Sequence, residues 1–188
     1  MTMKSRRRSA VATAAALSIA GLVSPVTALG APTAPAATTP APAAGGDTLI
    51  ISEYIEGSSN NKALELYNYG TVAIDLSGYE IYGSQNGGTS NYTVPLTGIL
   101  APGAVHVVAH GEWALDFVPD QTATLLHNGN DAVVLRTSAD EVVDAIGQVG
   151  YDPGTAWGTS PTTTQDATLV RNHDVCAGDT ITDDAFDP

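Results

Sequence analysis

From residue 47 onward, short apolar runs alternate with turn residues at intervals of about ten residues. The runs are rich in Val, Ile, Leu and Tyr, and Gly, Pro, Asn and Asp separate them. No segment holds a helical period for long. The pattern therefore predicts an all-β fold, with a spacing typical of a β-sandwich. The predicted strands are 48–55, 63–68, 78–82, 91–94, 104–109, 123–126, 132–136 and 142–146.

Alternation within three of these strands predicts which side chains face the core. Successive side chains of a strand point to opposite faces, so every second residue shares a face. The residues assigned to the core in this way are Leu64, Leu66, Val105, Val107, Val133 and Leu135. His106, which lies between two of them, is then expected to face solvent.

The first 46 residues differ in composition from the rest of the chain. Lys4 and Arg6 to Arg8 precede a short apolar run over 9–23, a pattern that predicts a secretory signal peptide over 1–30 and a secreted, extracellular protein. The run is too short and too rich in Ala to act as a stable membrane anchor. Residues 31–46 read APTAPAATTPAPAAGG, and this low diversity predicts a disordered linker.

The charge of the exported part argues against nucleic acid as a direct partner. After residue 46 the chain has three basic and 20 acidic residues, a formal net charge of −17. Proteins bind phosphate backbones through clustered Lys and Arg, which this region lacks. The acidity favours solubility outside the cell, and cation binding is the less favoured interpretation.

The pattern of apolar runs fades after residue 150, so residues 151–188 are predicted to form a loop-rich tail or exit linker. Trp157 and Leu169 are its large apolar residues, and we expect a strap along the sandwich edge with Trp157 against the core. Cys176 is the single cysteine, so a disulfide within the chain is excluded and any partner lies elsewhere. We therefore expect the coding sequence to continue, or once to have continued, beyond Pro188.

Four carboxylates are the candidates for a metal site. Glu53 and Glu65 lie in runs that we expect to pair as neighbouring strands, and Asp131 and Asp144 flank another hairpin. Calcium takes six to eight oxygens in flexible geometry and is the cation that such groups fit. The favoured interpretation is that each faces solvent or accepts from a turn amide, since no DxDxDG loop is present.

The remaining polar residues predict no catalytic or cofactor site. His106 and His110 would lie about 13 Å apart on one strand, too far to share a metal ion. His127, at a hairpin end, is interpreted as a solvent-facing histidine. Ser58 and Ser59 lack the strand, turn and helix context that a nucleophile elbow requires.

Five segments together resemble a bacterial lamin tail domain, and they cover about the whole folded part. The resemblance implies an immunoglobulin-like β-sandwich over 47–150, in agreement with the predicted strands. The segments are LIISEYIEGSSNNKALELYNYG (49–70), IDLSGYEI (74–81), LAPGAVHVVAH (100–110), LLHNGNDAVVLR (125–136) and VVDAIGQVGYDPGTAWG (142–158).

The resemblance also implies a context. Bacterial lamin tail domains often precede a catalytic domain of the endonuclease/exonuclease/phosphatase family, and TLVRNHDVCAGDTITDDAFDP (168–188) is similar to the segment that leads out of the domain in such nucleases. The expected function is a non-catalytic accessory or docking module of a secreted nuclease, with the downstream catalytic domain as its partner and the divalent metal held there. The alternative is a stand-alone secreted or surface module for binding or adhesion. An enzyme in its own right is the weakest hypothesis, and the oligomeric state stays open.

Overall fold

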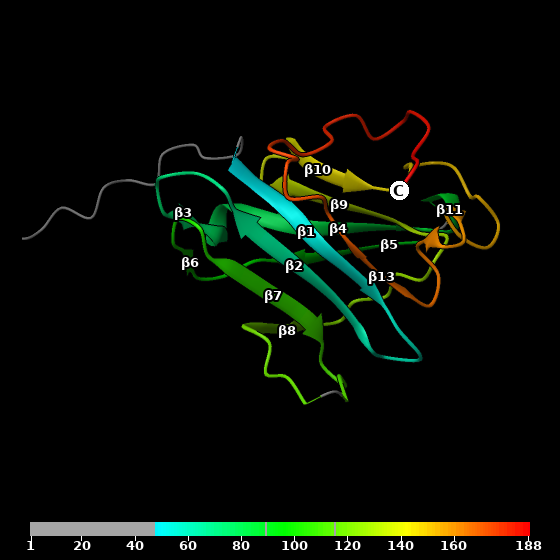
Figure 1. Cartoon of the computed structure of the whole chain (residues 1–188), viewed down its shortest axis with the longest axis horizontal. Helices are drawn as coiled ribbons and strands as arrows, with labels where there is room; N and C mark the ends of the chain where they lie inside the picture. Colours follow the sequence, from blue (N-terminus) through cyan, green and yellow to red (C-terminus); the bar gives the residue numbers. More distant parts are fainter. Residues whose placement is uncertain (1–47, 89, 115) are drawn as a thin grey trace, which may run out of the picture. The chain divides into compact units, whose positions relative to one another are not determined.

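Two β-sheets packed on each other carry the fold of this chain (Figure 1). The computed structural model describes residues 48–188 except 89 and 115. The predicted signal peptide over 1–30 and the predicted linker over 31–46 lie outside these residues. The described part contains no helix long and apolar enough to cross a membrane.

The larger sheet has five strands in the order β13-β1-β2-β7-β8, antiparallel except for the parallel pair of β7 and β8. Its strands are β1 (Leu49–Glu56), β2 (Lys62–Asn68), β7 (Val105–His110), β8 (Gln121–Ala123) and β13 (Ala167–Val170). The second sheet is antiparallel and has the order β10-β9-β4-β5. Its strands are β4 (Tyr79–Gln85), β5 (Ser90–Pro95), β9 (Ala132–Thr137) and β10 (Val142–Ile146).

Two small ribbons and two short turns complete the described part. The ribbons are β3 (Ile74–Asp75) with β6 (Ile99–Leu100), and β11 (Gly158–Thr159) with β12 (Thr162–Thr163). The 3-10 turns are η2 (Leu76–Gly78) and η3 (Asn86–Gly88). The all-β sandwich predicted from the spacing of apolar runs is confirmed, with strand bounds within a few residues for seven of the eight predicted strands.

The exception is the predicted strand 123–126, which the structure replaces by β8 (Gln121–Ala123) followed by irregular chain. Here the chain leaves the five-stranded sheet, and the Leu126 carbonyl accepts from the Gln85 side chain instead of from the backbone of a neighbouring strand. Leu125 is fully buried in the core although it lies outside any strand. Its hydrophobicity therefore reports burial, not strand pairing.

The core lies between the two sheets and contains the predicted residues Leu64, Leu66, Val133 and Leu135, none of which is exposed. Within the four-stranded sheet, the close contact of one cross-strand pair, Gly83 with Tyr92, needs glycine. A Cβ atom on Gly83 of β4 would lie inside the ring of Tyr92 on β5, so any larger residue would push the ring away.

The prediction for β7 is wrong, because the strand faces the core with its other side. Val108 pairs with Leu64 and is fully buried in the core, whereas Val105 is 46 % exposed. His106 pairs with Leu66 and therefore shares the inner face, where its Nε2 is buried. The prediction failed because the outer face is also apolar: Val107 belongs to a second buried cluster, and Trp113 from the next loop packs against this cluster.

Residues 151–188 pack on the sandwich and add β13 to the edge of the larger sheet beside β1. Trp157 is 4 % exposed, which confirms the prediction that it lies against the core. Its indole requires a glycine at position 147, where φ is +82° and a Cβ atom would lie 2.7 Å from Nε1.

Candidate functional site

The four carboxylates predicted from the sequence lie at three separate places. The strands of Glu53 and Glu65, β1 and β2, pair as expected, and the two residues are direct cross-strand neighbours. Asp131 lies in the loop before β9, and Asp144 lies on β10. Within 48–188, leaving out 89 and 115, no three residues of the types His, Cys, Asp and Glu gather in a metal-binding group. The structure therefore brings one pair of the candidates together.

Glu53 and Glu65 lie on the outer face of the larger sheet. The pairing of β1 with β2 shifts between Ile51 and Glu53, and this bulge lets the Ser52 hydroxyl donate to the Glu65 carboxylate at 2.7 Å. Partial burial, together with the negative charge of Glu65, raises the pKa of Glu53. The pair is thus a like-charge contact that the chain itself only partly relieves.

Asp144 is completely buried and clamps three segments of the chain. Its carboxylate accepts from the backbone N–H groups of Ile51 and Asp179, each at 2.8 Å, and forms an ion pair with Arg171 at 2.8 Å. Burial raises the pKa of Asp144, and Arg171 and the amide donors oppose that rise. Since protein donors surround the carboxylate, its evident role is to hold β1, β10 and the C-terminal segment together.

Asp131 has the contacts of a turn aspartate. Its two carboxylate oxygens accept from the backbone N–H groups of Asn86 and Asn128, each at 2.9 Å. Its own carbonyl accepts from Nε1 of Trp157 at 3.0 Å. Burial raises the pKa of this carboxyl, and the two amide donors lower it. The residue therefore joins the β4–β5 hairpin to the tail that follows β10.

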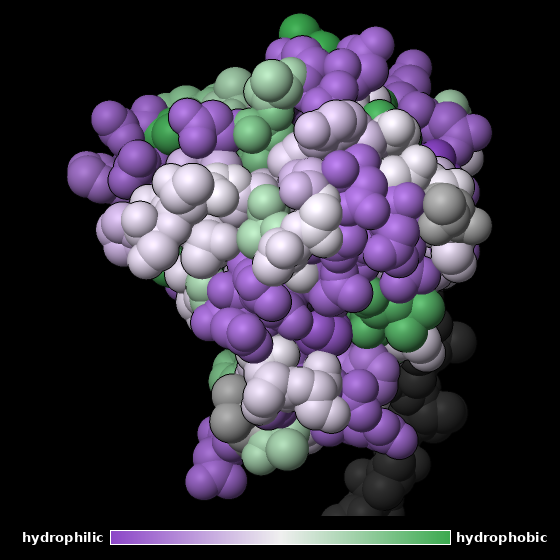
Figure 2. Space-filling view, turned by 90° about the vertical axis from the view of Figure 1, so that its right-hand side faces the viewer, coloured by the Kyte–Doolittle hydropathy of each residue, from purple (hydrophilic) through white to green (hydrophobic). Residues whose placement is uncertain are grey.

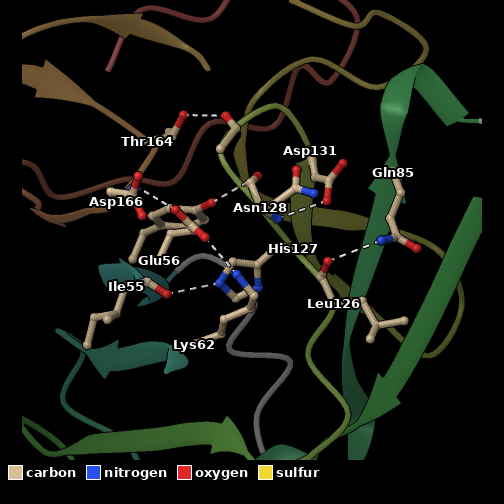
Figure 3. Close-up of polar contacts among 12 residues, drawn as sticks. Ile55, Glu56, Lys62, Gln85, Leu126, His127, Asn128, Asp131, Thr164 and Asp166 are labelled. Carbon is tan, nitrogen blue, oxygen red and sulfur yellow. Dashed lines mark hydrogen bonds and ion pairs between the residues drawn. The ribbon is translucent and has the colours of Figure 1, made fainter. Parts of the chain in front are cut away.

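His127 is fully buried, so its interpretation as a solvent-facing residue is wrong. Nε2 lies 3.0 Å from the Ile55 carbonyl, and Nδ1 lies 3.5 Å from the Tyr92 hydroxyl. Its ring also packs on Tyr54, with centroids 4.9 Å apart. Burial lowers the pKa of His127 to about 4, so the imidazole is neutral near pH 7. Figure 3 shows the ring pointing toward Ile55, beneath the loop that holds Asn128 and Asp131.

Glu56, next to this histidine, links the end of β1 to two further segments (Figure 3). Its carboxylate accepts from Nζ of Lys62 at 2.7 Å and from the backbone N–H of Asp166. Thr164, close by in the tail, donates to the Gly129 carbonyl. No sequence signal predicts this cluster, because its members come from three distant parts of the chain, around residues 56–62, 127–129 and 164–166. Its contacts hold those parts together.

All three basic residues of the described part are engaged in ion pairs. Lys62 pairs with Glu56 at 2.7 Å, and Arg171 pairs with Asp144. Arg136 pairs with Glu80 at 2.6 Å and with Asp140 at 2.9 Å, and it also lies over the ring of Tyr82. The described surface therefore offers a phosphate group no cluster of free cations. Figure 2 shows one face of this surface, where hydrophobic residues form only small separate spots among hydrophilic ones.

A cavity of about 740 Å³ opens where the C-terminal segment crosses the edge of the sandwich. Ile51, Tyr54 and Ile146 contribute apolar surface from the sheets, and Phe186 contributes it from the C-terminal segment. Phe186 also meets Trp157 edge to face, with centroids 6.1 Å apart. No sequence signal predicts this cavity, since its walls are far apart in the chain.

Comparison with known proteins adds one match. The family model described as Lamin Tail Domain matches residues 42–150, which is more than half of the 188 residues. No curated protein matches the chain.

Proposed function

Because the chain belongs to the lamin tail domain family, we propose that it is the non-catalytic accessory module of a secreted bacterial nuclease. Phosphodiester hydrolysis then belongs to a separate downstream catalytic domain, which is the partner of this module and which holds the divalent metal. The immunoglobulin-like sandwich of residues 48–188 acts as a spacer or docking unit for that domain.

One observation supports the non-catalytic role above all others. Two buried side chains that could serve a hydrolase as base or acid are engaged in holding the fold: His127 between Ile55 and Tyr92, and Asp144 against Arg171. A general base must reach the proton that it removes, and a fully buried imidazole between two protein partners is far from that position. The proposal that the protein is secreted is supported by the basic and apolar residues of 1–30. The proposal that it belongs to a nuclease is supported by the similarity of residues 168–188 to the linkers of such nucleases.

The cofactor proposal follows from the same contacts. Protein donors occupy the carboxylates of Asp131 and Asp144, so neither offers calcium a free set of oxygens. Glu53 and Glu65 are two residues, and calcium takes six to eight oxygen ligands. We therefore propose that this region works without a bound metal.

The experiment compares two properties of the proteins that the producing bacterium releases into its medium. Released proteins are separated in a gel that contains DNA, and a parallel gel is probed with antibodies against residues 48–188. We expect the antibody to detect the band that degrades DNA. An antibody-reactive species in the medium with no nuclease activity would contradict the nuclease context, and its absence from the medium would contradict export.

The alternative function is a stand-alone secreted or surface module for binding or adhesion. The outer face around Glu53 and Glu65 favours it, because these paired carboxylates are partly exposed and form no ion pair among the described residues. The same gel experiment separates the two hypotheses, since a stand-alone module migrates at the mass of the sandwich and its tail.

A further inference from the structure

The outer face of the five-stranded sheet combines apolar residues with an acidic centre. One row of side chains crosses four strands on this face, in the order Val170, Glu53, Glu65 and Val107. Directly paired residues share a face, so these side chains are neighbours. In Figure 1 this sheet lies in front, and no helix or strand is drawn over β1 and β2.

Part of this face is covered by the chain itself and part is open. Trp113 packs against the small buried cluster of Ala63, Val107 and Ala109 on β2 and β7. By contrast, Val170 is 64 % exposed and Val105 is 46 % exposed. The acidic pair therefore lies in an apolar setting, with exposed valines on both sides of it.

The charge of the pair has no counterion within the described part of the chain. Glu65 accepts from Ser52, while the Glu53 carboxylate has no hydrogen-bond or ion-pair partner among the described residues. The three basic residues, Lys62, Arg136 and Arg171, are paired with other carboxylates. Like charges placed directly opposite each other on neighbouring strands are destabilising. A cation from outside would relieve this repulsion.

We propose that this face docks a protein partner through a basic segment in which Arg or Lys alternates with apolar residues. A guanidinium or ammonium group binds between Glu53 and Glu65, and the apolar residues beside it cover Val170 and Val105. Charge complementarity selects this occupant: a second copy of the exported chain has a net charge of −17, and nucleic acid presents phosphates. The proposal does not depend on a parent nuclease, so the two can fail separately.

The test uses the full chain and a synthetic ten-residue peptide of alternating Arg and Val. Binding is followed by isothermal titration calorimetry. We expect the double variant Glu53→Gln/Glu65→Gln to bind this peptide about tenfold more weakly or worse, since a factor of ten is about 1.4 kcal/mol. Val170→Ser should weaken binding as well, and a peptide of alternating Arg and Ser should bind less than the Arg and Val peptide.

The matched control is Asp183→Asn/Asp184→Asn, which removes the same charge from two exposed positions far along the chain. Thermal melting verifies that each variant is folded, and removing the like-charge pair should leave Glu53→Gln/Glu65→Gln at least as stable as the parent chain. Equal losses of affinity in both double variants would show general charge attraction and overturn the proposal, as would failure of the peptide to bind the parent chain. Calcium that raises the melting temperature of the parent but not of Glu53→Gln/Glu65→Gln, and that displaces the peptide, would assign the pair to a divalent cation instead.

Discussion

At the scale of single residues, burial decides the chemistry of the polar groups. His127 lies among Tyr54, Tyr92 and the Ile55 carbonyl, and water does not reach it. A charged imidazole is poorly solvated there, so its pKa falls. Asp144 is equally buried, but Arg171 and three amide donors compensate its charge. Burial therefore keeps the imidazole of His127 neutral, whereas the carboxylate of Asp144 stays paired with Arg171.

The neutral state of His127 predicts a loss of stability in mild acid. The pKa of this histidine is about 4 in the folded chain and 6.5 ordinarily, so between these values the unfolded chain binds a proton that the folded chain does not. Stability should therefore decrease as the pH falls from about 6.5 to about 4, by about 3 kcal/mol for this group. Denaturant unfolding of the parent chain and of His127→Gln at several pH values measures the effect.

The difference between the two chains isolates this histidine, because Glu53, Asp131 and Asp144 have raised pKa values that act in the opposite direction. His173→Gln, which removes an imidazole from an exposed position, is the matched control. A His127→Gln variant with the pH dependence of the parent would contradict the buried neutral state.

Removing Arg171 predicts a large loss of stability, because it leaves the buried carboxylate of Asp144 without its cation. We expect Arg171→Met to cost about 3 to 5 kcal/mol near neutral pH. The cost should shrink as the pH falls, since Asp144 without its guanidinium partner takes up a proton more readily. Asp144→Asn/Arg171→Met should recover part of the loss in denaturant titrations. Equal stability of Arg171→Met and the parent chain would show that the ion pair of Asp144 with Arg171 contributes nothing to the free energy of unfolding.

At the scale of elements, the strands are held in place by segments far away in sequence. β13 is added to the edge of β1 by residues 167–170, and Glu56 at the end of β1 accepts from Asp166 just before β13. The inner face of β7 is chosen by its register with β2, in which Val108 lies opposite Leu64. Trp113 then covers the outer face of the same strand. An element of this domain is therefore defined by its neighbours as much as by its own pattern.

The register of β7 predicts unequal effects of one substitution at two of its valines. Val108→Thr places a hydroxyl in the core without a partner and should cost about 1 to 3 kcal/mol. Val105→Thr lies at a 46 % exposed position and should change stability by about 0.5 kcal/mol or less. Thermal unfolding of both variants measures the difference. A larger loss of stability in Val105→Thr than in Val108→Thr would instead support the prediction from the sequence that Val105 faces the core.

At the scale of the whole molecule, electrostatics limits what the domain can bind. Residues 47–188 include three basic and 20 acidic residues, and all three basic residues are engaged in ion pairs. Partners with clustered negative charge are repelled, and basic protein segments are attracted. This charge distribution agrees with the proposal that the module leaves contact with nucleic acid to another domain.

The charge predicts that the chain without residues 1–30 does not bind duplex DNA, even at low salt where electrostatic binding is strongest. A mobility-shift assay at about 50 mM salt checks this, with a basic DNA-binding protein as the positive control. A shift that weakens as salt is raised would show a cationic surface that the described residues do not contain.

The sequence by itself determined the fold class, most strands and most of the core. Period-two alternation depends only on neighbouring residues, so Leu64, Leu66, Val133 and Leu135 were assigned correctly. The pairing of the strands that hold Glu53 and Glu65 was also predicted, because a short turn joins them, and the structure adds that the two residues lie directly opposite each other.

Tertiary structure alone decided the burial of His127, the ion pair of Asp144 with Arg171, and the face that β7 turns to the core. Each depends on residues that meet across 27 or more positions of the chain, such as Ile55 with His127 or Asp144 with Arg171. The local sequence pattern does not encode such long-range contacts, because the free energy that stabilises them comes from burial and pairing in the assembled sandwich. The same side chain is solvated or buried, charged or neutral, according to which distant segment covers it.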